Sequence, residues 1–221
     1  STLGGAGEGR LRVGFAVFGA GTFDYSRPTH VRTYIPGMGD WTGMRSIEVV
    51  NKPGADGLGA EFSVHAKTTD PIELAPGITL DTSWRANHQE SDNSFQIQDP
   101  PFLETEMPEG AEFAHHLNSH GAFLELVDLA YWRPTGYSRI QCYLTGDDAL
   151  GIAKQWREVE TDYVRHQSEK HKDNLNPLFF FNEIGPEGYR KWTTLRSKMG
   201  KAIAPLMPLL DLQDSTIETR V

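Results

Sequence analysis

Short runs of β-branched and aromatic residues occur throughout the first hundred residues of this chain. Runs of this kind, four to eight residues long and bounded by turn residues, are typical of β-strands. Turn signals such as Pro36-Gly37 and Pro76-Gly77 separate them. The predicted strands are residues 12–18, 30–35, 46–50, 60–66, 78–84 and 94–98, the last two as a pair joined by the polar stretch 87–93. This spacing favours an antiparallel sandwich or barrel.

The hydrophobic period changes to that of a helix after a connector with three prolines, residues 99–110. An apolar stripe predicts a helix from Phe113 to Tyr131. Its inner positions are Phe113, Leu117, His120, Leu124, Val127 and Tyr131. Pro134-Thr135-Gly136 ends this helix, and residues 137–145 alternate as a strand.

Three further elements are expected after residue 146. Asp147 or Asp148 is placed to cap a helix. The apolar stripe of that helix is Ile152, Trp156, Val159 and Tyr163. Residues 178–181 are predicted to form a short strand, and Gly185-Pro186-Glu187 opens the last helix. The predicted inner face of the last helix is Tyr189, Trp192, Leu195 and Met199.

These patterns predict an α+β fold, with a strand-rich antiparallel first half, sandwich- or barrel-like, packed against the helices of the second half. Residues 11–221 are expected to form one domain, strand-rich over 11–105 and helix-rich over 109–221. The glycine-rich residues 1–10 are interpreted as a flexible lead-in or an expression remnant. Ser215-Thr216-Ile217-Glu218 fits a helix-starting capping box, yet only three residues follow it, so we expect a truncation before a C-terminal domain.

Composition and charge narrow the classes of function. No apolar stretch has membrane-spanning length, and the single cysteine, Cys142, permits no internal disulfide. We therefore expect a cytoplasmic protein without a membrane partner. The net charge of −9 disfavours nucleic acid except at a local basic patch. That patch is Arg190, Lys191, Arg196, Lys198 and Lys201, interpreted either as a partner or phosphate contact or as a solvated helix face.

Histidines and glycines supply weak cofactor motifs. His116 and His120 lie four residues apart on one predicted helix face, with Glu112 one turn earlier as a third candidate metal ligand. The general-base Glu of an H-E-x-x-H motif is missing, so buried helix histidines are the preferred interpretation. A G-x-G string at Gly19 and Gly21 has Asp24 where the dinucleotide fingerprint needs its third glycine. No cofactor and no metal are predicted.

Two candidate catalytic groups also have simpler explanations. Cys142 shares a strand face with Ile140 and Leu144, a pattern that indicates a buried apolar residue rather than a nucleophile. Arg165 and His171 match R-x(4–6)-H, the catalytic spacing of HEPN ribonucleases, but one such match is expected by chance in this sequence. The fragment is therefore expected to be non-catalytic.

The second half of the chain has several segments in a recognisable order: residues 123–134, the strand 138–144, Pro177-Leu178-Phe179-Phe180-Phe181, residues 205–212 and Thr216-Ile217-Glu218-Thr219-Arg220. This order resembles the ApeA-like N-terminal domain. The resemblance implies a β-rich module followed by helices, placed ahead of a C-terminal HEPN ribonuclease domain in bacterial abortive-infection proteins. It transfers no catalytic residue, because the Arg/His pair of that family belongs to the HEPN domain.

Three functions follow from these observations. The first is a non-catalytic sensing or regulatory module of a HEPN-type antiphage protein, with the HEPN domain or another protein as partner. The second is a carbohydrate- or ligand-binding β-rich domain of a structural or phage-related protein, with Trp41, Trp84 or Trp132 as stacking platforms. The third is a hydrolase whose site joins His115, His116, His120 and a carboxylate from distant loops.

Overall fold

A seven-stranded antiparallel sheet forms the centre of the fold in the computed structural model, which describes residues 14–19, 23–53, 60–89, 94–147, 155–164 and 176–203. The strand order is β1-β11-β10-β2-β9-β6-β5. The strands are β1 (Phe15–Phe18), β2 (His30–Tyr34), β5 (Ile72–Ala75), β6 (Ile78–Thr82), β9 (Pro101–Glu106), β10 (Arg139–Tyr143) and β11 (Arg157–Thr161). Strands from both halves of the chain therefore share one sheet.

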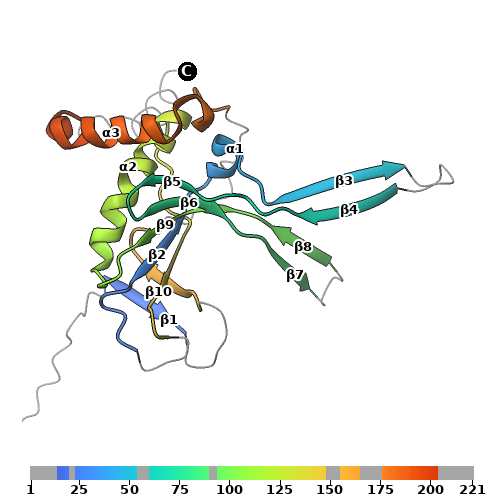
Figure 1. Ribbon diagram of the computed structural model, residues 1–221, viewed down its shortest axis with the longest axis horizontal. Helices are drawn as coiled ribbons and strands as arrows, with labels where there is room; N and C mark the ends of the chain where they lie inside the picture. The colour runs from blue at the N-terminus through green and yellow to red at the C-terminus, as the bar shows by residue number, and fades with distance from the viewer. Residues whose placement is uncertain are drawn as a thin grey trace, which may run out of the picture.

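Two hairpins project from this sheet on the side away from the helices (Figure 1). One pairs β3 (Ile47–Pro53) with β4 (Ala60–Ala66), and the other pairs β7 (Arg85–Gln89) with β8 (Ser94–Gln98). The second hairpin prolongs the β6–β9 pair, since the register runs from Thr82 opposite Pro101 to Arg85 opposite Gln98. Only the bases of the hairpins therefore adjoin the packed body of the domain.

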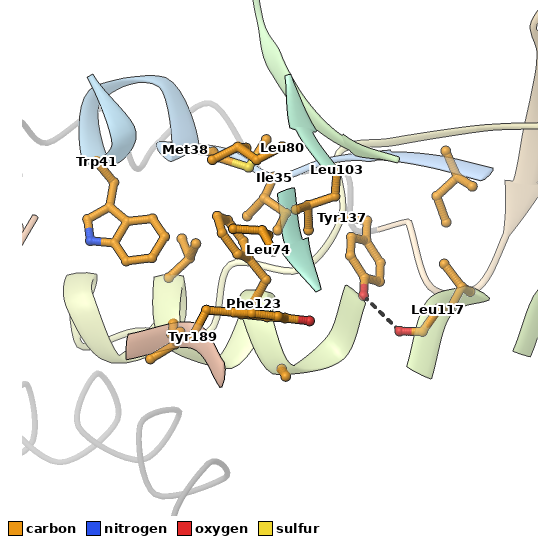
Figure 2. Packing of buried hydrophobic residues seen from close by; sticks show 14 of the residues in the cluster. Ile35, Met38, Trp41, Leu74, Leu80, Leu103, Leu117, Phe123, Tyr137 and Tyr189 are labelled. Atoms are coloured by element: carbon orange, nitrogen blue, oxygen red, sulfur yellow. Dashed lines mark hydrogen bonds between the residues drawn. The ribbon is translucent and has the colours of Figure 1, made fainter. Parts of the chain in front are cut away.

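Within the described residues, three helices cover the body: α1 (Met38–Thr42), α2 (Phe113–Tyr131) and α3 (Phe181–Ile203). Helix α2 packs against β2 and β9, while α3 packs against β5, α1 and α2. Figure 2 shows Trp41, Phe123 and Tyr189 meeting where the three helices converge, with Leu74 and Leu80 of the sheet beside them. Tyr137 donates a 3.4 Å hydrogen bond to the carbonyl of Leu117, which ties the loop after α2 back to that helix. The core thus lies between α2 and the sheet.

The end of α2 has an unusual backbone. Trp132, which follows the helix, adopts the left-handed conformation with φ 51° although it is not glycine. Its amide donates to Asp128 and Leu129 carbonyls, so the strained residue closes the last helical turn. The amide of Leu178 donates to the carbonyl of Ala130 at 2.7 Å and brings the start of α3 to the same place.

The structure confirms the α+β class, with antiparallel strands in the first half and helices in the second. The predicted helix over 113–131 and the strand over 60–66 agree with α2 and β4. As to the sandwich- or barrel-like arrangement, seven of the described strands form a sheet whose order begins at β1 and ends at β5, and the other four form the two projecting hairpins. Helices, rather than a second sheet, cover its apolar face.

The prediction of a connector over residues 99–110 was wrong, because this segment contains β9, a central strand of the sheet. Its prolines misled the prediction, since proline donates no ladder hydrogen bond. Pro101 occupies the first position of the strand, where a missing donor is tolerated, and Phe102 and Leu103 behind it are fully buried.

Two other predicted elements have a different structure. The prediction of a helix with the stripe Ile152 to Tyr163 was wrong for the part of this segment that the structure describes, because residues 157–161 form β11. In that strand Val159 is buried, whereas its neighbours Glu158 and Glu160, which point to the opposite face of the sheet, are half-buried and exposed, respectively, as the period of two of a strand requires. The strand expected over 178–181 was also wrong, since α3 begins at Phe181.

The predicted pairing of residues 78–84 with 94–98 was wrong. β6 pairs with β5 and β9, and β8 pairs with β7, which lies partly in the stretch interpreted as a turn. On α3, Tyr189 is buried as expected, but Leu195 and Met199 are exposed. Residues 1–10 and 204–221, which include the expected lead-in and the capping box, lie outside the described residues.

Candidate functional site

A cavity of about 540 Å³ opens between β1, β11 and the first turn of α2. Ligand pockets typically have volumes of about 300–1,000 Å³. Three phenylalanines, Phe15, Phe23 and Phe113, supply its apolar wall. Its polar groups come from Tyr25, Ser26, Glu112 and Arg157. Strands from both ends of the sequence thus build a concave site with a few polar groups among aromatic rings.

The aromatic wall is ordered by ring stacking. Phe15 and Phe113 lie parallel with ring centroids 4.7 Å apart and an interplanar angle of 16°. Tyr163 lies on the same stack, 6.0 Å from Phe15. Because Phe15 is held between two rings, Phe23, which is 40% exposed, is the phenylalanine with the most free surface at the cavity.

Arg157 is held beside the cavity by an almost buried ion pair. Its Nε and Nη2 groups donate to Oδ2 of Asp147 at 3.1 and 3.0 Å, and the two side chains are 12% and 4% exposed. Tyr25 donates its hydroxyl proton to the same carboxylate oxygen and accepts from Arg157 Nε at 3.3 Å. The side chain of Arg157 passes so close to Gly19 that a Cβ there would lie 2.5 Å from Cδ. The guanidinium is therefore fixed in position before any ligand arrives.

The electrostatics of this network favour its charged form. The hydrogen bond from Tyr25, assisted by Arg157, holds the pKa of Asp147 below its ordinary value. The hydrogen bond to Tyr25 and the ion pair with Asp147 raise the pKa of Arg157. Burial, together with the bond to Asp147, raises the pKa of the Tyr25 hydroxyl. At neutral pH the cavity thus has a fixed cation whose charge is balanced by Asp147.

The sequence identified only part of this site. The sequence suggests Asp147 as a helix cap, Glu112 as a metal ligand and Phe113 as an inner helix position, whereas it does not single out Arg157, Phe15 and Phe23. Arg157 was placed on a predicted helix, so its strand position beside Gly19 could not be seen. No local motif marks these residues, because they come from four separate segments.

The histidines do not assemble with Glu112. His116 accepts from the Thr105 hydroxyl at 2.7 Å and donates to the Pro28 carbonyl at 3.1 Å. His120 is fully buried, with Nδ1 2.8 Å from the Thr33 hydroxyl and Nε2 without a partner. Glu112 is exposed at the cavity instead. Within the described ranges no three His, Cys, Asp or Glu side chains form a group that would hold a metal ion.

The other candidate catalytic groups also lie apart. Cys142 is buried in the core, and burial raises the pKa of its thiol to about 12, which keeps it protonated at neutral pH. His115 is exposed on α2, whereas His116 and His120 lie under the sheet, so these three do not converge. Arg165 and His171 fall outside the described residues.

The basic residues of α3 divide into two groups. Arg190 donates to the carbonyls of Glu73 and Leu74, Lys191 pairs with Glu187, and Arg196 donates to Glu125 at 2.9 Å. Lys198 and Lys201 are exposed. Arg196 lies on the packed side of the helix, next to Tyr189, and lines a cleft between α2 and α3. Arg196 therefore differs from the other four basic residues, all of which are exposed.

We expect Arg196→Ala to lower the free energy of unfolding by about 0.5–1 kcal/mol, since it removes a partly exposed ion pair with Glu125. Lys198→Ala, on the exposed side of the same helix, should change it by less than about 0.5 kcal/mol. Urea titrations followed by circular dichroism measure both. Equal losses in the two variants would show that Arg196 has no structural role.

Comparison with known proteins adds the family. Residues 1–192 match the family described as ApeA N-terminal domain 1. The chain belongs to this family. No curated protein and no solved structure matches it. The ApeA N-terminal domain family is associated with abortive infection, an antiviral response.

The match includes residues 123–134 and 177–181, which suggested the resemblance, and ends before residues 205–212 and 216–220, which also suggested it. It also includes the whole strand-rich half, where no motif was recognised, and about half of α3. Every residue that lines the cavity of this ApeA N-terminal domain falls within the matched range. None of the helices in the described ranges combines the length and apolar character needed to cross a bilayer.

The tryptophans of the ApeA N-terminal domain have different environments. Trp41 is fully buried and its Nε1 donates to the Phe179 carbonyl at 2.8 Å, so it is a core residue. Trp84 and Trp132 are 52% and 48% exposed. Trp84 stands at the base of the β7–β8 hairpin and Trp132 at the end of α2. Two of the three proposed stacking platforms are thus accessible.

Proposed function

We propose that this ApeA N-terminal domain is the non-catalytic sensing or regulatory module of a HEPN-type antiphage protein. The observation that carries the proposal is the family match over residues 1–192. In that arrangement a ribonuclease domain in the parent protein cuts RNA, and this module determines when it does so. The preformed cavity at Arg157 supports a sensing role, because a signal needs a place to bind.

The electrostatics of the chain agree with a module that does not itself grip RNA. Its net charge is −9, and three of the five basic residues of α3 have partners: Lys191 and Arg196 are paired with carboxylates and Arg190 donates to backbone carbonyls, which leaves the exposed Lys198 and Lys201. Phosphate contacts depend on free lysine and arginine side chains. We therefore assign recognition of RNA to another part of the parent protein. The role of this domain would be to control that part in the cytoplasm.

The test begins with the parent gene. We expect the reading frame to continue past Val221 into a helical domain with an R-x(4–6)-H pair. In cells challenged with phage, the complete protein should reduce plaque formation, and substitution of that pair should abolish protection. Deletion of residues 1–203 should give either constitutive toxicity or no protection. A stop codon directly after Val221, or infection-dependent protection that survives the deletion, would contradict the proposal.

A second candidate is carbohydrate binding, which the exposure of Trp84 and Trp132 favours. Exposed indole rings offer flat apolar faces for sugar rings. Titration of the chain with a panel of bacterial glycans should then shift tryptophan fluorescence, and Trp84→Ala or Trp132→Ala should remove the shift. Fluorescence unchanged by every glycan would exclude this role.

A further inference from the structure

The cavity at Arg157 has features of a site for one class of small molecule. Its apolar surface is aromatic, with Phe15, Phe23 and Phe113 on the wall. Flat heteroaromatic rings stack on such side chains, and each base–aromatic stack contributes about 1–3 kcal/mol to binding. Phe23 is the ring that retains the most exposed surface for this contact.

Hydrogen-bond donors remain on Arg157 despite its ion pair. The bonds to Asp147 and Tyr25 use Nε and Nη2. The Nη1 group has no hydrogen-bond partner among the described residues, and it is not among their fully buried unpartnered atoms. Because Arg157 lines the cavity, a ligand with acceptor atoms on a planar edge can accept hydrogen bonds from Nη1. Arginine recognises base edges in this way in nucleic acids.

The charge balance selects against an anionic ligand. Asp147 neutralises Arg157, and the exposed carboxylate of Glu112 adds a negative charge at the cavity. The chain as a whole has a net charge of −9. A phosphate group would meet this field without a free cation to offset it. An uncharged ring with amine or hydroxyl donors can instead use the Glu112 carboxylate as an acceptor.

From these observations we infer that the cavity binds an uncharged nucleobase or nucleoside. The ring contacts Phe23 and the edges of Phe15 and Phe113, its acceptor edge faces Arg157, and its donors face Glu112. The inference builds on the proposed sensing role, because it names the class of signal that this cavity would detect. Binding itself can be measured without any ribonuclease activity.

The experiment titrates the 221-residue chain with adenosine, guanosine, cytidine and uridine, and with their 5′-monophosphates, by calorimetry and ligand-observed NMR. We expect at least one nucleoside to bind with a dissociation constant of about 10 µM to 1 mM. Its monophosphate should bind more weakly. Absence of binding by all four nucleosides at millimolar concentration would overturn the inference.

Variants locate the binding at the cavity. Phe23→Ala should weaken nucleoside binding by about fivefold or more, and Phe23→Leu, which keeps apolar volume without a ring, should do the same. Phe180→Ala is the matched control, since Phe180 is similarly exposed at 44% but lies at the start of α3. Equal affinities of Phe23→Ala and Phe180→Ala would overturn the assignment of the cavity.

A second pair of variants tests the charge argument. Glu112→Gln removes the negative charge without loss of a helix-cap bond, because this N-cap residue makes none through its side chain. This variant should reduce the difference in binding affinity between a nucleoside and its 5′-monophosphate. Glu73→Gln, an exposed glutamate on β5, should leave that difference unchanged. Monophosphate or single-stranded RNA binding more tightly than the nucleosides would overturn the proposed ligand class.

The two proposals fail in different ways. If no nucleoside binds, the inference about the ligand is wrong, while the regulatory role still stands on the phage assay. If a nucleoside binds at the cavity but Phe23→Ala leaves phage protection by the complete protein unchanged, the ligand site stands. The sensing role of this cavity is then wrong.

Discussion

Replacement of Trp41 by alanine is expected to lower the free energy of unfolding by about 3–5 kcal/mol. Trp41 is fully buried and contacts three aromatic rings, with centroids 5.2 Å away for Phe123, 5.5 Å for Phe181 and 6.1 Å for Phe179. The substitution leaves a cavity where α1, α2 and α3 meet, and it leaves the Phe179 carbonyl without its indole donor. Urea denaturation followed by circular dichroism measures the loss.

Trp84→Ala is the matched control for this prediction. Trp84 is 52% exposed, so its loss should cost less than about 1 kcal/mol. Trp41→Phe keeps most of the ring packing, so its loss of unfolding free energy should lie between the losses of Trp41→Ala and Trp84→Ala. This variant can be measured if Trp41→Ala does not fold. Similar free energies of unfolding for the Trp41→Ala and Trp84→Ala variants would show that the three-helix contact does not stabilise the domain.

A decrease in pH from 7 to 5 is expected to destabilise the domain through its buried histidines. Burial, with a smaller effect of His116, lowers the pKa of His120 from 6.5 to about 3. Burial also lowers the pKa of His116, although its bond to the Pro28 carbonyl opposes this. Because the folded pKa values lie below the unfolded ones, the unfolded chain binds more protons in this window. Stability is therefore complete above about pH 6.5 and is lost as the pH falls toward about 3.

The contribution of His120 can be isolated with a non-titrating variant. The free energy of unfolding of the His120→Gln variant should depend less on pH than that of the unmodified chain, because up to one fewer proton is taken up on unfolding. Between pH 7 and pH 5 this difference amounts to about 2 kcal/mol. His115→Gln, an exposed residue on the same helix, is the control and should retain the full pH dependence. Urea midpoints at pH 7, 6 and 5 measure the slopes. Parallel slopes for His120→Gln and the unmodified chain would refute the prediction.

Local sequence patterns succeeded where one element had one clear period. The stripe from Phe113 to Tyr131 predicted α2 with its observed bounds, since a helix that buries one face needs apolar residues every three to four positions. The prediction that Cys142 is a buried apolar residue is confirmed, because it shares a strand face with Ile140 and both side chains are buried. These features depend on residues that are near each other in the chain.

Predictions failed where long-range pairing overrode the local signal. Residues 99–110 were interpreted as a connector because of their three prolines, yet pairing with β2 and β6 makes residues 101–106 a central strand. Residues 157–161 fit a helical stripe, but β1 and β10 on either side supply strand partners. In both segments the hydrogen bonds come from partners far away in sequence, so tertiary context outweighed the local pattern.

Patterns along the chain were sufficient to predict the α+β class, the main helix, the lack of a membrane-spanning apolar run and a resemblance that the family match confirmed. Only the tertiary structure showed that Phe23 and Tyr25, Glu112 and Phe113, and Arg157 lie around one cavity, with Asp147 behind Arg157. The physical reason is that these residues belong to separate segments, each with its own local role. Sheet pairing of β1 with β11, rather than any spacing along the chain, brings them together.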